Sequence, residues 1–125
     1  MDSEFKIKLF VWLWLKSRPD KRVALLLLDS KNRFLECKAL HISESRLPRA
    51  YDRSITCAIQ KHKAASVVLC HNHRSGDTTP SVEDIYLTEY LNNALSKKGF
   101  NLLAHYIVTK TDCVECPISE RNNKK

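Results

Sequence analysis

Residues 66–84, SVVLCHNHRSGDTTPSVED, join a valine-rich apolar run, a polar loop and the start of a helix in direct succession. The apolar run 66–70 predicts a short buried strand, and a loop is expected over 71–80. A helix is expected over 81–98, followed by another strand over 101–109. A helix between two strands is typical of an α/β domain, in which helices pack on a mixed sheet.

The expected helix over 81–98 has sequence signals at both of its ends. Ser81 and Asp84 have the S-x-x-D spacing of a capping box ahead of an apolar run. Gly99 is a natural C-terminal stop, because glycine adopts the left-handed conformation that ends many helices. The apolar stripe of this helix consists of Leu87, Leu91, Ala94 and Leu95.

Upstream of this unit, a hairpin and a second helix are expected. The continuous apolar run 22–28 predicts a strand buried on both faces, and the polar residues 29–32 predict a turn. The returning strand is expected over 33–40. After a polar loop, helical spacing predicts a helix over 51–63. Its inner face is expected to carry Ile55, Ala58, Ile59 and His62.

The N-terminal segment 2–16 has two interpretations. Its apolar second half is compatible with an amphipathic helix, whereas the alternation of Trp12 and Trp14 is typical of a strand. Packing of the two indoles against the core is the simpler expectation, and a dimer surface formed by them is the alternative. The oligomeric state is therefore left open.

The bulk composition predicts one cytoplasmic domain. With 125 residues, 43% of them apolar, a single domain over 1–125 is expected, with its core at about 20–118 and a basic tail at 119–125. The apolar runs 9–15 and 23–28 are too short for a bilayer, which needs about 20 apolar residues, so no membrane partner is expected. Five cysteines and no recognisable secretory signal predict reduced thiols in the cytoplasm.

The formal charge of +7, from 21 Lys+Arg against 14 Asp+Glu, is compatible with a nucleic-acid partner. A solvated basic surface is the simpler interpretation, because no dense run of basic residues occurs and aromatic residues do not interleave with the charges. The lone C-x-x-C of Cys113 and Cys116 lacks the second pair that a four-thiolate zinc site needs. These two are therefore expected to be ordinary thiols near a loose C-terminus.

The polar loop carries the candidate metal ligands. Residues i and i+2 of an extended strand end point the same way, so His71 and His73 can aim two imidazoles at one point. Asp84, in the first turn of the next helix, can supply an oxygen to that point. Two histidines and one carboxylate leave a fourth position on zinc for water, which is the pattern of catalytic sites. Zinc would lower the pKa of this water from about 15.7 to about 7.

The same residues have a purely structural interpretation. Ser81 and Asp84 alone are more often a helix cap than a functional site, and a His-Asn-His sequence after a strand can be an ordinary polar loop. The two interpretations are compatible, because a capping serine can also stand beside a metal. The spacing of His71 and His73 in a strand–loop–helix context favours the metal site.

The pattern H-x-H-x7-S-x-x-D within residues 71–84 resembles the JAMM motif of the JAB/MPN metalloprotease-like domains. The same stretch is similar to the bacterial RadC-type signature, in which the position of Arg74 is usually proline. The resemblance covers roughly residues 20–109. Its other matching segments are 25–29, 32–33, 52–65, 67–70 and 102–108.

This resemblance implies a JAB/MPN-like (cytidine-deaminase-like) α/β fold, a mixed sheet flanked by helices, in a short form without the helix-hairpin-helix domain of the long RadC members. It implies Zn²⁺ on His71, His73 and Asp84, with Ser81 holding the water or the developing oxyanion. In eukaryotic and archaeal relatives the reaction is hydrolysis of a peptide or isopeptide bond, including removal of ubiquitin-like modifiers. The RadC branch has a historical association with DNA repair.

The general base is where this chain departs from the family pattern. Family members usually place a glutamate at the start of the first strand, where this chain has Lys21 with Asp20 beside it. Asp20 and Glu36 are therefore the candidate catalytic carboxylates, and Glu44 is a further one. In a second departure, alanine replaces the aspartate that usually precedes His105. That histidine is expected to be a packed or surface residue rather than a ligand.

Two functions from different classes follow. The first is a zinc-dependent hydrolase of JAMM type, which cleaves a peptide or isopeptide bond in a peptide or protein substrate. The second is a catalytically weak or inactive metal-binding module with a DNA-related role, by binding nucleic acid or as a nuclease. The charge of +7 and Lys21 at the expected glutamate position motivate the second.

Overall fold

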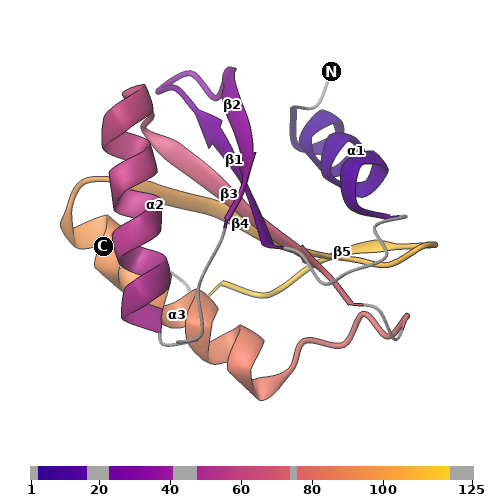
Figure 1. Ribbon diagram of the computed structural model, residues 1–125. Coiled ribbons are helices and arrows are strands. Elements are labelled where there is room, and N and C mark those ends of the chain that lie inside the picture. The colour runs from indigo at the N-terminus through magenta and orange to yellow at the C-terminus, as the bar shows by residue number, and fades with distance from the viewer. Residues whose placement is uncertain (1–2, 17–22, 41–47, 74–75, 119–125) are drawn as a thin grey trace.

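The computed structural model describes residues 3–16, 23–40, 48–73 and 76–118. Within these residues, a mixed sheet has five strands in the order β2-β1-β3-β4-β5, and three helices flank it (Figure 1). The strands are β1 (Val23–Leu28), β2 (Phe34–Ala39), β3 (Ser66–Asn72), β4 (Asn101–Val108) and β5 (Cys113–Glu115). The helices are α1 (Ser3–Leu15), α2 (Pro48–His62) and α3 (Val82–Lys97). The expected α/β fold, a mixed sheet with helices packed on it, is confirmed.

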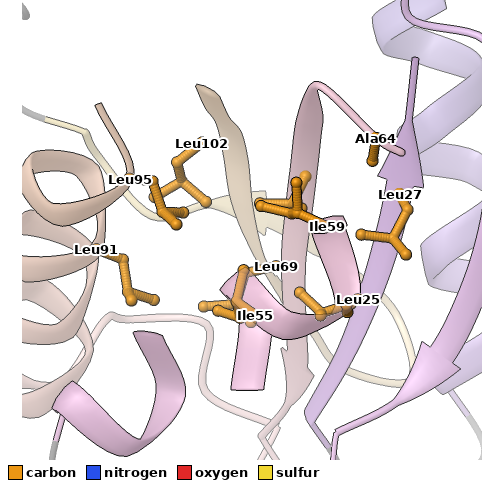
Figure 2. Close-up of a cluster of buried hydrophobic side chains, with 11 residues drawn as sticks. Leu25, Leu27, Ile55, Ile59, Ala64, Leu69, Leu91, Leu95 and Leu102 are labelled. Carbon is orange, nitrogen blue, oxygen red and sulfur yellow. The ribbon is translucent and has the colours of Figure 1, made fainter. Parts of the chain in front are cut away.

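Helices α2 and α3 cover one face of the sheet. Buried side chains from both helices meet leucines of β1, β3 and β4 there, and Figure 2 shows this cluster. Leu91 and Leu95 belong to the apolar stripe expected on α3, and both are fully buried. The same helix also buries two polar side chains, Thr88 and Asn92, which the stripe did not include. One of these, Thr88, lies next to the functional site described below.

Helix α1 covers the opposite face (Figure 1). Val11 and Leu15, one helical turn apart, are fully buried against β1, β3 and β4. The backbone of Ser3–Leu15 is α-helical, and residues i and i+4 of a helix lie on the same face. The strand interpretation of residues 2–16 is therefore wrong, and the helical one is confirmed over the described part of that segment.

The two indoles of α1 pack on this face as half-buried side chains. The Nε1–H of Trp12 donates to the backbone oxygen of Thr109 at 3.2 Å, and the Nζ of Lys16 lies 4.2 Å from the Trp12 ring centroid. Trp14 lies against Phe10, with ring centroids 6.4 Å apart. The expectation that the tryptophans pack against the core is confirmed.

The hairpin of β1 and β2 forms as expected. Asp29 organises its turn, since its Oδ1 accepts the backbone N–H groups of Lys31 and Arg33, each at 2.9 Å. Asn32 takes a positive φ of 62°, a conformation that asparagine tolerates better than most residues. β1 then pairs antiparallel with β3 on its other side, which makes it a central strand. This position explains its continuous apolar sequence.

The unit β3–α3–β4 positions the candidate ligands. β3 and β4 pair in parallel, with α3 as the crossover between them. Strand β3 is longer than expected and continues through His71 and Asn72, because these residues pair with Ile107 and Val108 of β4. The expected loop therefore starts two residues later than predicted. Helix α2 similarly begins at Pro48, earlier than the expected 51, with proline in the first turn where its missing N–H costs nothing.

Strand β5 was not expected from the sequence. It pairs antiparallel with β4 at the edge of the sheet. Cys113 lies in this strand and Cys116, just after it, is fully buried, so these two thiols lie in ordered structure rather than in a loose segment. All five cysteines are free thiols. None of the helices in the described residues is long and apolar enough to cross a membrane.

Candidate metal centre

Two histidines from the carboxyl end of β3 form one side of the centre. His71 is the next-to-last residue of the strand and His73 follows it directly. The expected period of two holds, and the two imidazole rings lie with their centroids 4.8 Å apart. His71 is buried among the strand residues, whereas His73 is half-buried. The two rings therefore share one side of the sheet edge.

The start of α3 forms the other side. The side chain of Ser81 accepts the backbone N–H of Asp84 at 3.0 Å, and the Oδ2 of Asp84 accepts the backbone N–H of Ser81 at 2.9 Å. This reciprocal pair is the predicted capping box. It locks the Asp84 carboxylate at the first turn of the helix, where Oδ1 faces His71 and Oδ2 faces His73. The capping and metal interpretations of these residues are therefore compatible.

The three candidate ligands converge. The Nε2 of His71 lies 3.2 Å from the Oδ1 of Asp84, and the Nε2 of His73 lies 3.2 Å from its Oδ2. One ligand atom from each of the three residues falls within 4.8 Å of the others. Tetrahedral zinc, with bonds of about 2.0–2.2 Å, separates its ligand atoms by roughly 3.3 Å. The donor set and its spacing thus fit a zinc ion.

The Nδ1 atoms of both histidines are occupied by protein groups. The Nδ1 of His73 lies 2.8 Å from the backbone oxygen of Asp77, which can only accept, so this Nδ1 carries the proton. The Nδ1 of His71 lies 2.9 Å from the Nε2 of His105. Each ring therefore uses Nδ1 for support and turns Nε2 toward Asp84. This division of the two nitrogens is common among metal-bound histidines.

The Asp84 carboxylate is held in its ionised form. Burial opposes its charge, but the hydrogen bonds from His71 and from the Ser81 backbone N–H outweigh it and hold the pKa of Asp84 well below its usual range. An ionised carboxylate between two imidazoles is an anionic ligand for a cation. The charge of the centre therefore agrees with its geometry.

Of the two candidate catalytic residues that the structure describes, Ser81 lies at the metal centre and Glu36 does not. Ser81 lies at the site, exposed, with its Oγ accepting from Asp84 and its hydroxyl hydrogen not used in that bond. Glu36 pairs with Leu27, whereas Val23 is the β1 residue that pairs with His71. Four residues along a strand separate these two positions by about 13 Å, so the structure does not bring Glu36 into the cluster.

The remaining carboxylate candidates lie outside the described residues. These are Asp20, beside Lys21, and Glu44, and Arg74 of the motif is also outside. Within the described part of the chain, the cluster that can hold a metal consists of the two histidines and Asp84 alone.

The buried histidine behind His71 was not predicted from the sequence. His105 is fully buried, with its Nδ1 2.6 Å from the Oγ1 of Thr88 and its Nε2 on His71. Burial, with a smaller contribution from His71, lowers the pKa of His105 to about 3, so the ring is neutral. The expectation that it is packed rather than a ligand agrees with this position. However, no signal in the sequence indicates its contact with the centre.

With this geometry in place, comparison with known proteins identifies the family. The family model described as the RadC-like JAB domain matches residues 2–121. The chain belongs to the RadC-like JAB domain family. The resemblance noted in the motif is thus confirmed.

Relatives of this RadC-like chain occur in several bacteria. A protein from Clostridium novyi is 34% identical over 103 residues, which cover 82% of this chain and 44% of the relative. A protein from Janthinobacterium is 36% identical over 108 residues, covering 86% and 48%. One from Vibrio cholerae is 41% identical over 90 residues, covering 72% and 57%. All three carry the name UPF0758 protein, which states no activity, and this chain spans about half the length of the first two.

Proposed function

We propose that this protein is a zinc-dependent hydrolase that cleaves a peptide or isopeptide bond at the centre formed by His71, His73 and Asp84. The observation that carries the proposal is the convergence of three ligand atoms within 4.8 Å, with both imidazole Nδ1 atoms already engaged. This arrangement holds its ligands in place before a metal binds, as expected for a site that has to keep an open coordination position.

The chain's own residues have separate roles in this proposal. The two histidines and Asp84 hold the zinc ion, which when bound supplies a Lewis acid and a water of lowered pKa. Ser81 uses its hydroxyl hydrogen to donate to the substrate carbonyl oxygen as negative charge develops there. A carboxylate moves the proton, and Asp20 is the better candidate, because it lies three residues before Val23, the partner of His71.

The surface beside the centre favours a peptide over a phosphate-rich ligand. Val82, Ile85 and Tyr86, on the first turns of α3, are 81%, 42% and 61% exposed. They lie on the same turns as Asp84 and offer apolar contacts to side chains next to a scissile bond. A nucleic-acid surface would place basic side chains at this position.

The proposal is tested by measuring zinc content and cleavage together. Purified protein is expected to carry about one zinc per chain by mass spectrometry and to cleave peptide or isopeptide substrates only when loaded. His71→Ala/His73→Ala is expected to lose both properties. His62→Ala, which removes a histidine of α2 outside the cluster, serves as the matched control. Zinc-loaded wild type that cleaves no substrate in a varied panel would contradict the hydrolase assignment.

A second function is supported by what the described residues lack. No carboxylate besides Asp84 joins the cluster among the described residues, and the chain carries a charge of +7. The charge favours nucleic acid as the partner, and the three-residue cluster favours a metal-holding module that binds it without turnover; a nuclease using the same centre is the alternative within this class. Binding to DNA that weakens steeply with salt would support this function, because phosphate contacts release counterions. A plasmid-nicking assay with a chelator control separates binding from cleavage.

A further inference from the structure

His105 occupies an unusual position between a metal ligand and a helix. Its ring has no solvent exposure, and both of its nitrogens have side-chain partners. The Nε2 atom lies 2.9 Å from the Nδ1 of His71, and the Nδ1 atom lies 2.6 Å from the Oγ1 of Thr88. A chain of three side chains therefore connects the candidate ligand to the buried face of α3.

A β-bulge turns His105 toward His71 and Thr88. Leu102 packs in the core under α2 and α3, whereas Ala104, two residues later, packs in the core under α1. In a regular strand these two residues would share a face, and the register shift between Val67 and Val68 accounts for the change. Because of the extra residue, His105 pairs beside Leu69 on the α3 face. A regular strand would have turned its ring toward α1.

The hydrogen bonds of Thr88 determine which ring nitrogens of His105 and His71 carry protons. Its hydroxyl donates to the backbone oxygen of Asp84 at 2.7 Å, so its only hydrogen is used there. The Oγ1 must then accept from His105, which places the proton of that ring on Nδ1. A buried neutral ring with its proton on Nδ1 has a bare Nε2, and this atom accepts the Nδ1–H of His71.

We propose that His105 and Thr88 are a positioning pair that keeps the proton of His71 on Nδ1 and leaves Nε2 as its metal ligand. The inference rests on the metal centre of the proposed function and not on hydrolysis. It also explains why Thr88 is needed. The backbone oxygen that supports His73 can only accept. A histidine behind His71 can donate or accept, and Thr88 fixes which of the two it does.

The first test is the tautomer of His71 in metal-free protein. The two ring nitrogens of each histidine are distinguished by nitrogen-15 NMR of histidine-labelled protein. The His71 signals are assigned with His71→Ala. We expect His71 to carry a proton on Nδ1. Wild-type protein with the proton of His71 on Nε2 would overturn the proposal, and this measurement needs neither zinc nor activity.

The second test is zinc affinity, measured by competition with a chromophoric chelator. Thr88→Val keeps the shape of the side chain but removes the acceptor, so His105 is free to move its proton to Nε2 and donate to His71. Zinc affinity is then expected to fall by about 10–100-fold, the usual effect of losing such support. Thr88→Ser restores the hydroxyl and is expected to bind zinc as wild type does.

The control is Thr56→Val, since Thr56 also lies on a helix and its hydroxyl also bonds to an aspartate four residues earlier, away from the centre. It is expected to leave both the tautomer and the affinity unchanged. Thr88→Val with wild-type zinc affinity, or Thr88→Ser as weak as Thr88→Val, overturns the proposal. If wild type binds no zinc, the proposed function fails, whereas the tautomer still decides the roles of His105 and Thr88.

Discussion

The Nε2 of His71 lies 3.2 Å from the Oδ1 of Asp84. With its proton on Nδ1, His71 would offer a lone pair of Nε2 to a cation, as Asp84 offers one of Oδ1, and a metal ion between the two atoms would gain two attractive contacts. His73 repeats the arrangement at 3.2 Å from Oδ2, also with its Nδ1 occupied. A metal ion at this centre is therefore expected to stabilise the folded chain.

This relationship predicts that zinc protects the protein against heat through Asp84. At zinc concentrations of about 100 times the Kd, the free energy of unfolding is expected to rise by about 2.7 kcal/mol. For a domain of this size, that corresponds to a rise in Tm of roughly 10 °C, measured by circular dichroism with and without a chelator. Asp84→Asn, which keeps an oxygen for the cap, is expected to lose most of this shift.

The matched control for Asp84→Asn is Glu83→Gln. It removes a negative charge from the same helical turn and so has a similar effect on the helix dipole. Its zinc-dependent shift in Tm is expected to equal that of wild type. Equal shifts in all three proteins would show that the ion binds elsewhere.

A second prediction separates the two roles of Ser81. As a cap, Ser81→Ala is expected to lower the free energy of unfolding by about 1 kcal/mol, and Ser81→Gly by only a few tenths. As an oxyanion donor, both variants lose the same hydroxyl, so both are expected to lower kcat by about 10²–10³-fold. Urea unfolding and peptide-cleavage kinetics measure the two effects. A kcat that follows stability across the two variants would leave Ser81 with the capping role alone.

The residues that the sequence predicted correctly at this centre depend on local geometry. His71 and His73 obey the period of two in an extended chain, and Ser81 and Asp84 obey the three-residue spacing of a capping box. These rules need no knowledge of distant parts of the chain. The order of strand, loop and helix was accessible for the same reason, and it was sufficient to predict the fold.

The support behind the centre depends on contacts between distant residues. His105 reaches His71 only because a bulge at one position of β4 changes the face of the sheet on which His105 lies. No residue type in that segment indicates the bulge. Strand β5 has three residues, too few for a period to be visible. In α1, apolar side chains on both faces allowed the alternation of Trp12 and Trp14 to suggest a strand. Packing against the sheet decided among these alternatives.

A third prediction concerns the thiols and their dependence on pH. Burial raises the pKa of Cys37 to about 12 and that of Cys113 to about 11. Both therefore remain protonated near neutral pH, and their reaction with iodoacetamide is expected to accelerate about tenfold per pH unit as the thiolate fraction grows. Cys57, which is exposed, is expected to be alkylated first.

Mass spectrometry after timed alkylation measures this order, with urea-unfolded protein as the control in which all cysteines react. Early labelling of the buried Cys70 in folded protein would contradict the packing of β3 against α1.

The last prediction addresses the missing general base. Glu36 lies beside Leu27, four residues along β1 from the partner of His71, so Glu36→Gln is expected to leave kcat unchanged. Asp20→Asn is expected to lower kcat by about 10²–10⁴-fold, the usual contribution of a positioned proton-transferring group. Zinc content is measured in both variants, because neither residue is a proposed ligand and both proteins should bind zinc as wild type does.

Loss of activity in Glu36→Gln with full zinc content would mean that the sheet register places the base differently. If neither variant affects cleavage, Glu44→Gln is the next test, and a third unchanged kcat would remove the carboxylate base from the proposed mechanism. Since cleavage would then proceed without any of these carboxylates, another group or the solvent would have to accept the proton of the attacking water.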